Sequence, residues 1–278
     1  MSKESLLPTL LLLACCGSPA LARSASFLEQ CRQPSTAAQP TLEALLQVAQ
    51  TDNCAAADDV LRNSTRLTLN GAGLSDLSLL RAFPQLTELY LDNNAIVDLA
   101  PLVHLPQLQT LALGNNRIMD GSPLGQMTAL RELYLNGNRL RDLSPLASLS
   151  NLTELDLGHN DLEDLAPLAN LTQLTDLLAP SNAIADLSPL STLTQLDTLV
   201  LDRNQITDLS PLTGLDRLQT LQLDRNNITH LSPLNQLDSL LNLSIDDNPT
   251  REAERLALEQ TLNLKSLQIR HTCSGCDL

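Results

Sequence analysis

A 22-residue period in the sequence aligns side chains that could anchor a binding partner. Both tyrosines, Tyr90 and Tyr134, occupy one position of this period, and the aliphatic residues Leu178 and Val200 share it. Aromatic and aliphatic side chains exposed on a rigid surface are typical anchors of protein interfaces. The pattern therefore predicts a protein-binding patch. Asp156 occupies the same position, and the flanking positions complete the patch with Glu88, Asp92, Glu132, Asn136, Glu154 and Asp176.

The acidic charge of the chain narrows the kind of partner. The 17 Lys+Arg and 32 Asp+Glu residues give a formal net charge of −15, which argues against nucleic acid or an anionic membrane surface. The carboxylates of the patch would favour a protein with a basic surface and speed its encounter at low salt. The alternative is that they only keep the protein soluble, and single exposed apolar residues are normal on any surface.

One arrangement of side chains hints at nucleophilic catalysis. His159 and Ser181 lie one period apart, with Asp156 and Asp161 nearby. Nothing in the pattern supplies an oxyanion hole, and an open sheet does not exclude water. Glycine-rich phosphate loops and metal-binding motifs such as HExxH are absent from the sequence. We expect no enzymatic activity and no cofactor.

Aspartate recurs once per period, before a segment such as Leu143-Ser144-Pro145-Leu146. Serine before proline predicts a helical turn in which serine is the N-cap and proline the first helical residue. We interpret these aspartates as turn residues and not as metal ligands: Asp76, Asp98, Asp120, Asp142, Asp164, Asp186 and Asp208. Calcium remains an alternative at a second acidic edge, whose charge Arg203 and Arg225 are expected to neutralise. That edge comprises Asp202, Asp224, Asp246 and Asp247.

Residues 1–22 have the features of a secretory signal. Lys3 precedes an apolar stretch at residues 6–14, and residues 20–22 form an A-x-A cleavage pattern. The apolar stretch is too short to span a bilayer, and no later segment is long enough to do so. The alternative is a lipoprotein signal with Cys15 as the lipidated residue. Either interpretation predicts export to the periplasm, the cell surface or the medium.

The cysteines favour cleavage after residue 22. That cleavage removes Cys15 and Cys16 and leaves an even set. Cys31 and Cys54 flank a predicted helix, and a disulfide between them would close a loop of about 23 residues. Cys273 and Cys276 are expected to pair with each other at the C-terminal end, since zinc would need a fourth ligand.

The same period dictates the elements that must position these residues. Leu-x-Leu predicts a short strand with both leucines directed inward, and the asparagine that follows predicts a bend. Eight full units and a ninth, partial one span residues 65–248. Residues 23–64, with a helix at 41–50, are predicted to cap one end, and residues 249–278 the other. The second cap is expected to contain a helix at 249–261 and a strand within 264–269.

These units resemble leucine-rich repeats, and the 22-residue form is most similar to that of bacterial internalins. The resemblance implies an α/β solenoid in which a curved parallel sheet lines a concave face and short helical turns lie on the convex side. It also implies a monomer that binds a protein on the concave face. No immunoglobulin-like module, wall-sorting motif or C-terminal anchor is expected, so host-cell invasion does not follow. The alternative function is a scaffold lipoprotein of the cell envelope anchored through Cys15.

Overall fold

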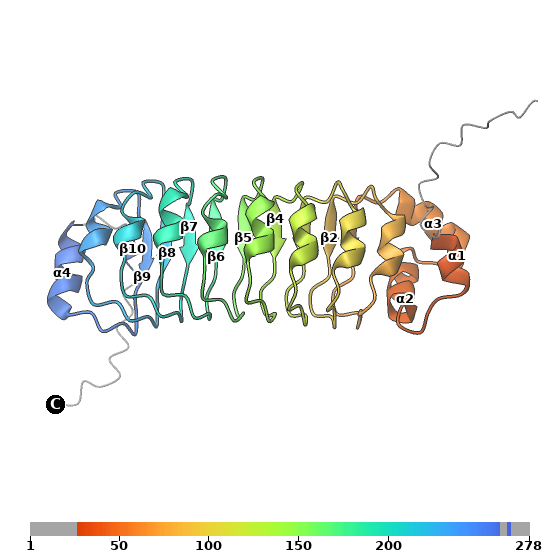
Figure 1. The fold of residues 1–278 in the computed structure, drawn as a ribbon, viewed down its shortest axis with the longest axis horizontal. Helices are drawn as coiled ribbons and strands as arrows, with labels where there is room; N and C mark the ends of the chain where they lie inside the picture. Colours follow the sequence, from red (N-terminus) through yellow and green to blue (C-terminus); the bar gives the residue numbers. More distant parts are fainter. Residues whose placement is uncertain (1–26, 262–265, 268–278) are drawn as a thin grey trace, which may run out of the picture.

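The computed structural model describes residues 27–261 and 266–267. Helices α1 (Phe27–Arg32), α2 (Gln39–Val48) and α3 (Cys54–Arg62) form one end of an elongated molecule, and α4 (Glu252–Thr261) lies at the other (Figure 1). Between them, one sheet of parallel strands runs in chain order without a crossover, which confirms the predicted solenoid. The strands are β1 (Arg66–Thr68), β2 (Glu88–Tyr90), β3 (Thr110–Ala112), β4 (Glu132–Tyr134), β5 (Glu154–Asp156), β6 (Asp176–Leu178), β7 (Thr198–Val200), β8 (Thr220–Gln222), β9 (Asn242–Ser244) and β10 (Ser266–Leu267).

Short 3₁₀ turns return the chain from one strand to the next on the side opposite the sheet (Figure 1). Proline in the first turn starts most of them, because its fixed φ suits a helix and its missing N–H is not needed there. The turns are Ser78–Ala82, Ala100–His104, Ser122–Gln126, Ser144–Ser148, Ala166–Leu168, Ser188–Thr192, Ser210–Leu212 and Ser232–Gln236.

Leucine fills the space between the sheet and the turns. The central residue of each strand points inward and pairs in register with its equivalents, as Leu89, Leu111 and Leu133 do. These three side chains are fully buried. The second leucine of each Leu-x-Leu segment, which directly follows the strand, is also buried, as Leu91 is. Because identical side chains stack at every coil, register is fixed by the inward leucines, and the intervening side chains must point to the concave face.

Asparagine closes each coil through its carboxamide. Asn138 donates from Nδ2 to the carbonyls of Leu113 (2.9 Å) and Leu135 (3.0 Å), and its Oδ1 accepts from the Ile118 N–H (3.0 Å). One buried side chain thus satisfies backbone groups of two successive coils. The same pattern recurs at the other asparagines of this position: Asn94, Asn116, Asn160, Asn182, Asn204, Asn226 and Asn248.

Aspartate, and not serine, caps the turns. In the repeat at Asp142, Oδ1 accepts the backbone N–H of Ser144 at 2.8 Å, and each of the other predicted turn aspartates makes the equivalent bond. The assignment of these aspartates to turn chemistry is therefore confirmed. The prediction that serine is the N-cap is wrong, since a leucine or Gly121 precedes the turn at that place. The serine hydroxyl instead donates to the aspartate, as Ser122 does to Asp120.

The N-terminal end is held by the predicted disulfide between Cys31 and Cys54, which joins α1 to α3. Phe27 of α1 packs against Phe83, with ring centroids 5.4 Å apart, and both rings are fully buried. The helix predicted to begin at Thr41 begins at Gln39, because Pro40 provides its first turn. Thr41 is buried and donates its hydroxyl to the carbonyl of Asp76, so it fastens α2 to the first coil.

The C-terminal end follows the prediction in part. The helix expected from Pro249 begins at Glu252, and its Leu258 is buried against the last coil. β10 lies within the segment predicted as a strand and pairs with β9. The predicted signal at 1–22 and the cysteines Cys273 and Cys276 lie outside the described residues. None of the helices in the described part of the chain is long and apolar enough to cross a membrane.

Candidate functional site

The in-register sheet brings the predicted site residues onto one face. Tyr90, Ala112, Tyr134 and Asp156 follow one another across β2 to β5, and Leu178 pairs with Val200 across β6 and β7. The rows on either side carry the polar members, with Glu88, Glu132, Glu154 and Asp176 at the strand starts. All of these side chains except Ala112 are partly exposed. The residues of the predicted patch therefore lie on consecutive strands of one face, from β2 to β7.

A pocket of about 430 Å³ opens between the two tyrosines. Tyr90 and Tyr134 form its sides, and the small residues Ala112 and Gly114 of the intervening coil leave the space between them. Strands β2 and β4 are two strand spacings apart, which is about 9–10 Å. Asp92, Asn93, Asn115 and Asn136 line the remaining rim.

A positively charged side chain of the same protein, that of Arg66, lies over the ring of Tyr90. The Arg66 guanidinium lies 4.7 Å from the Tyr90 ring centroid and pairs with the Glu88 carboxylate at 3.2 Å. The Tyr90 hydroxyl donates to the same carboxylate at 3.1 Å. Burial and the Glu88 carboxylate raise the pKa of Tyr90, and Arg66 acts against that rise.

Tyr134 lies among carboxylates, and in the described part of the chain no cation lies over its ring as Arg66 does over that of Tyr90. Its pKa is raised far above the usual value, first by burial and then by Glu154, whose carboxylate bonds the hydroxyl, and by Glu132. Burial also raises the pKa of Glu154, and neighbouring Asp176 and Glu132 add to this effect. Among the described residues, the ion pairs of the chain do not include Glu132, Glu154 or Asp176. The carboxylates on this part of the face therefore repel one another.

Two predicted site residues, Asp92 and Asp156, bond the backbone through their side chains, Asp92 on the next coil and Asp156 within its own coil. The Asp92 carboxylate accepts the backbone N–H of Gly114 at 2.7 Å, and Asp156 accepts that of Gly158 at 2.9 Å. Such bonds satisfy backbone donors at the strand ends. Leu178 and Val200 lie two and three strands beyond Tyr134, so the structure does not bring them into the tyrosine pocket.

The second acidic edge is also engaged in backbone contacts. Asp202 accepts the N–H of Asp224 at 2.8 Å, and Asp224 accepts that of Asp246 at 2.7 Å. Arg225 was expected to help neutralise this edge, and it does so by pairing with Asp247 at 3.1 Å. Among the residues that the structure describes, no group of three or more His, Cys, Asp or Glu side chains is arranged to hold a metal ion.

His159 and Ser181 share one backbone position in successive coils. Both have left-handed φ values, 54° and 57°, as do Asn93 and Asn115 at the same place in their coils. Every coil turns out of its strand through this conformation, so the recurrence of the column reflects the bend. Asparagine and glycine suit it best.

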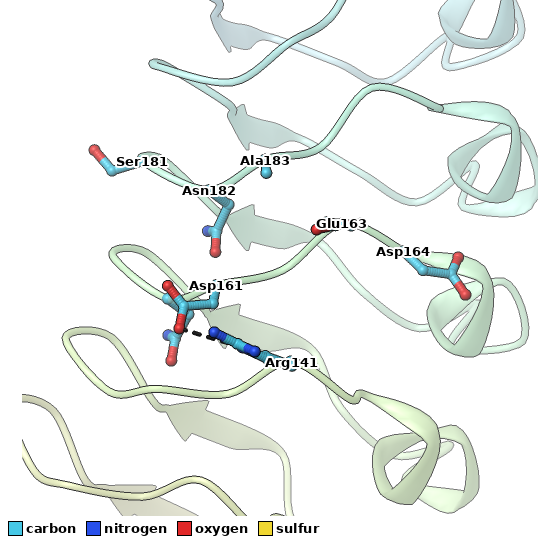
Figure 2. Close-up of a pocket in the computed structure, with 8 residues that line it drawn as sticks. Arg141, Asp161, Glu163, Asp164, Ser181, Asn182 and Ala183 are labelled. Carbon is cyan, nitrogen blue, oxygen red and sulfur yellow. Dashed lines mark ion pairs between the residues drawn. The ribbon is translucent and has the colours of Figure 1, made fainter.

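A second pocket, of about 670 Å³, lies at the bends that follow β4 to β6. Figure 2 shows Arg141 directed at Asp161, with which it pairs at 3.5 Å, and Ser181 and Asn182 on a neighbouring coil. Asp164 lies away from them, beside a 3₁₀ turn. Arg141 and Asp161 are 81% and 55% exposed, so this wide pocket offers a solvated ion pair and little else.

The residues that sequence reasoning missed are the small ones. Ala112 and Gly114 make the tyrosine pocket, although their side chains offer no chemistry of their own. The signal was a coil with two small outward residues between two coils that carry tyrosine.

Two sets of carboxylates make stability depend on pH in opposite directions. Burial raises the pKa of Glu154, Asp156 and Asp202, so the folded state gains stability as pH falls through these raised values. Bonds from the turn serines lower other carboxyl pKa values below the usual 3.8, and that stabilisation is lost as pH falls further. The second set is Asp120, Asp142, Asp186 and Asp208.

We expect the midpoint of thermal unfolding to rise from neutral pH to a maximum at about pH 4 and to fall below it. Circular dichroism melts across this range measure it. Replacing both Asp156 and Asp202 with asparagine should flatten the rise, while the decline at lower pH remains. A midpoint that decreases steadily from pH 7 to pH 4 would contradict this assignment.

Comparison with known proteins identifies the repeats. The family model described as Leucine Rich repeats (2 copies) matches residues 106–148 and 172–214. The curated proteins give no match. The solved structure of internalin C2 from Listeria monocytogenes is 31% identical, with a TM-score of 0.71, and the match covers 76% of this chain and 93% of that chain.

Two further solved structures are similar over about the same share of this chain. A leucine-rich-repeat protein from Leptospira interrogans is 27% identical, with a TM-score of 0.72, over 77% of this chain and 56% of its own. The functional domain of internalin J from Listeria monocytogenes is 24% identical, with a TM-score of 0.59, over 76% of this chain and 49% of its own. The likeness to internalin J is one of fold alone.

Proposed function

This chain belongs to the internalin-like class of leucine-rich-repeat proteins, and from that premise we propose that it is an exported protein that binds a protein partner on its concave face. The pocket between Tyr90 and Tyr134 is the centre of the site. Both tyrosines of the chain flank it, on strands whose positions the leucine core fixes. Tyrosine at the centre of a rigid surface is a frequent source of binding energy.

The charge of the face supports a partner with a basic surface. Glu132, Glu154, Asp156 and Asp176 lie on three consecutive strands beside the pocket. Burial and mutual repulsion raise the pKa of Glu154, which means that ionised carboxylates here gain from a neighbouring positive charge. We propose that Leu178 and Val200 form an outer, apolar part of the same contact.

Two observations support export. Residues 1–22 have the composition of a signal, and the disulfide between Cys31 and Cys54 is of a kind that persists in oxidising compartments. The intact mass of protein from its own host tests this proposal. A chain beginning at residue 23 is expected, whereas a lipidated chain beginning at Cys15 would support the anchored scaffold instead.

Partner capture tests the site. Residues 23–278 are cross-linked to extracts of the host's surroundings beside two variants, Tyr90→Ala/Tyr134→Ala and the control Gln222→Ala. Gln222 occupies the same row of the concave face on β8, away from the pocket. We expect a captured protein that the double variant loses and the control retains. Equal capture by both variants would exclude the tyrosine pocket as the site.

A further inference from the structure

The strand sequence Glu-Leu-Tyr occurs twice, at β2 and at β4. In the first copy, the guanidinium of Arg66 fills the space over the tyrosine ring and beside the carboxylate. Arg66 belongs to β1 and pairs in register with Glu88. The molecule itself therefore shows how a guanidinium occupies a Glu-Leu-Tyr strand.

The second copy lacks that arginine. The residue in register with Glu132 is Thr110, whose hydroxyl donates to Glu132 at 3.0 Å. Threonine brings no positive charge, so Glu132 and the Tyr134 ring keep the negative field that Arg66 offsets in the first copy. The two copies have the same strand sequence and differ in two ways. Arg66 supplies a cation in the first copy where the second has Thr110, and the tyrosine hydroxyl bonds Glu88 of its own strand in the first copy but Glu154 of the next strand in the second.

There is room for a guanidinium in the second copy. The Tyr134 ring borders the pocket of about 430 Å³, whose space exists because Ala112 and Gly114 are small, and Glu132 lies two residues before Tyr134 on the same strand, outside the lining of this pocket. Its width of two strand spacings, about 9–10 Å, allows one planar group to lie between the tyrosines. Arginine suits such a place better than lysine, since its planar guanidinium stacks on a ring and bonds a carboxylate at the same time.

We propose that Glu132 and Tyr134 bind an arginine side chain of the partner protein, in the way that Glu88 and Tyr90 bind Arg66. The inference rests on the proposed function and names the chemistry of the contact. Arg66 then has a second effect: it occupies the first Glu-Leu-Tyr strand, so the chain presents one arginine site and not two.

Tyrosine fluorescence provides a direct probe because the chain has two tyrosines and no tryptophan. In Tyr90→Phe, Tyr134 is the sole emitter. Titration with the capped peptide acetyl-Ser-Arg-Ser-amide is expected to change its fluorescence saturably in the millimolar range. The lysine peptide should bind about fivefold more weakly, and the neutral citrulline peptide should give no saturable change.

Two variants separate this contact from general attraction to an acidic surface. Glu132→Gln in the Tyr90→Phe chain is expected to weaken arginine-peptide binding by about tenfold. Asp176→Asn removes the same charge two strands away and should weaken it by less than about twofold. Thermal melts check that both variants fold.

A gain of binding gives the converse test. In Tyr134→Phe/Glu132→Gln, Tyr90 is the sole emitter, Arg66 covers its ring, and the second copy lacks its carboxylate, so the arginine peptide should cause no saturable change. Adding Arg66→Thr, which copies Thr110, is expected to create a response. Equal binding of the arginine and citrulline peptides, or an unchanged response in Glu132→Gln, would overturn the inference. If Tyr134→Ala still abolishes partner capture in that case, the protein-binding proposal stands and only its arginine chemistry fails.

Discussion

Replacing Asn138 with alanine is expected to lower the free energy of unfolding by about 3–5 kcal/mol. The change removes two donated bonds and one accepted bond at about 3 Å, and a longer donated bond to the Asn136 carbonyl at 3.4 Å, from a side chain that is 8% exposed. It leaves the Ile118 N–H buried without this partner, at about 1–3 kcal/mol. The Leu113 and Leu135 carbonyls still accept from Asn116 and Asn160, so each loses one bond, at about 1 kcal/mol. Chemical denaturation followed by circular dichroism measures the loss.

Asn136→Ala is the matched control, because it is the same substitution two residues away on the concave face. Asn136 is half-buried and lines the tyrosine pocket. A change within about 0.5 kcal/mol is expected for it. If Asn138→Ala lowered the free energy of unfolding no more than the control, the recurring asparagine would not be a source of stability.

Loss of the disulfide between Cys31 and Cys54 is expected to cost about 3 kcal/mol, since it closes a loop of 23 residues. The bridge joins α1 to α3, and α1 carries Phe27 onto Phe83 over the first coil. Without it, the N-terminal helices would hold the buried leucines of that coil less firmly. Cys31→Ala/Cys54→Ala should therefore melt at a lower temperature than the wild type.

The control for this prediction removes the other pair of cysteines. In a chain with Cys273→Ala/Cys276→Ala, a reducing agent should lower the melting temperature as far as the substitution of Cys31 and Cys54 does. In the same background, the reducing agent should have no effect on the melting temperature once Cys31 and Cys54 are also replaced with alanine. Full stability under reducing conditions would show that packing alone holds the cap.

The sequence was most informative where one residue type has one task in every repeat. The inward leucines fixed the strands, their register and the direction of each intervening side chain, so that Tyr90 and Tyr134 could be placed on one face in advance. The aspartate position was assigned to turns for the same reason, and all of its members make the same bond to the backbone.

Prediction failed where two neighbouring groups compete for one role. Serine and aspartate are both good caps, and only the three-dimensional path of the turn decides that Asp142 reaches the backbone of Ser144. Helix starts at Gln39 and Glu252 were each missed by two or three residues, which is usual for element ends.

The pocket could not be read from the chemistry of single residues. It arises from the absence of large side chains at Ala112 and Gly114, and its importance depends on Tyr90 and Tyr134 on the strands to either side. The contrast between Arg66 and Thr110 is likewise a relation between coils. Both would have required comparison of whole repeats across the sheet, and not inspection of each position in turn.

The location of the partner on the face tests the central claim most directly. The photo-reactive residue benzoylphenylalanine would replace Asn115 in one chain and Arg203 in another. Both are exposed turn residues with left-handed φ, 55° and 56°, at the same place in their coils, but only Asn115 borders the tyrosine pocket. We predict that the captured protein cross-links from position 115 and not from position 203. Cross-linking from 203 alone would contradict the assignment of the site to Tyr90 and Tyr134.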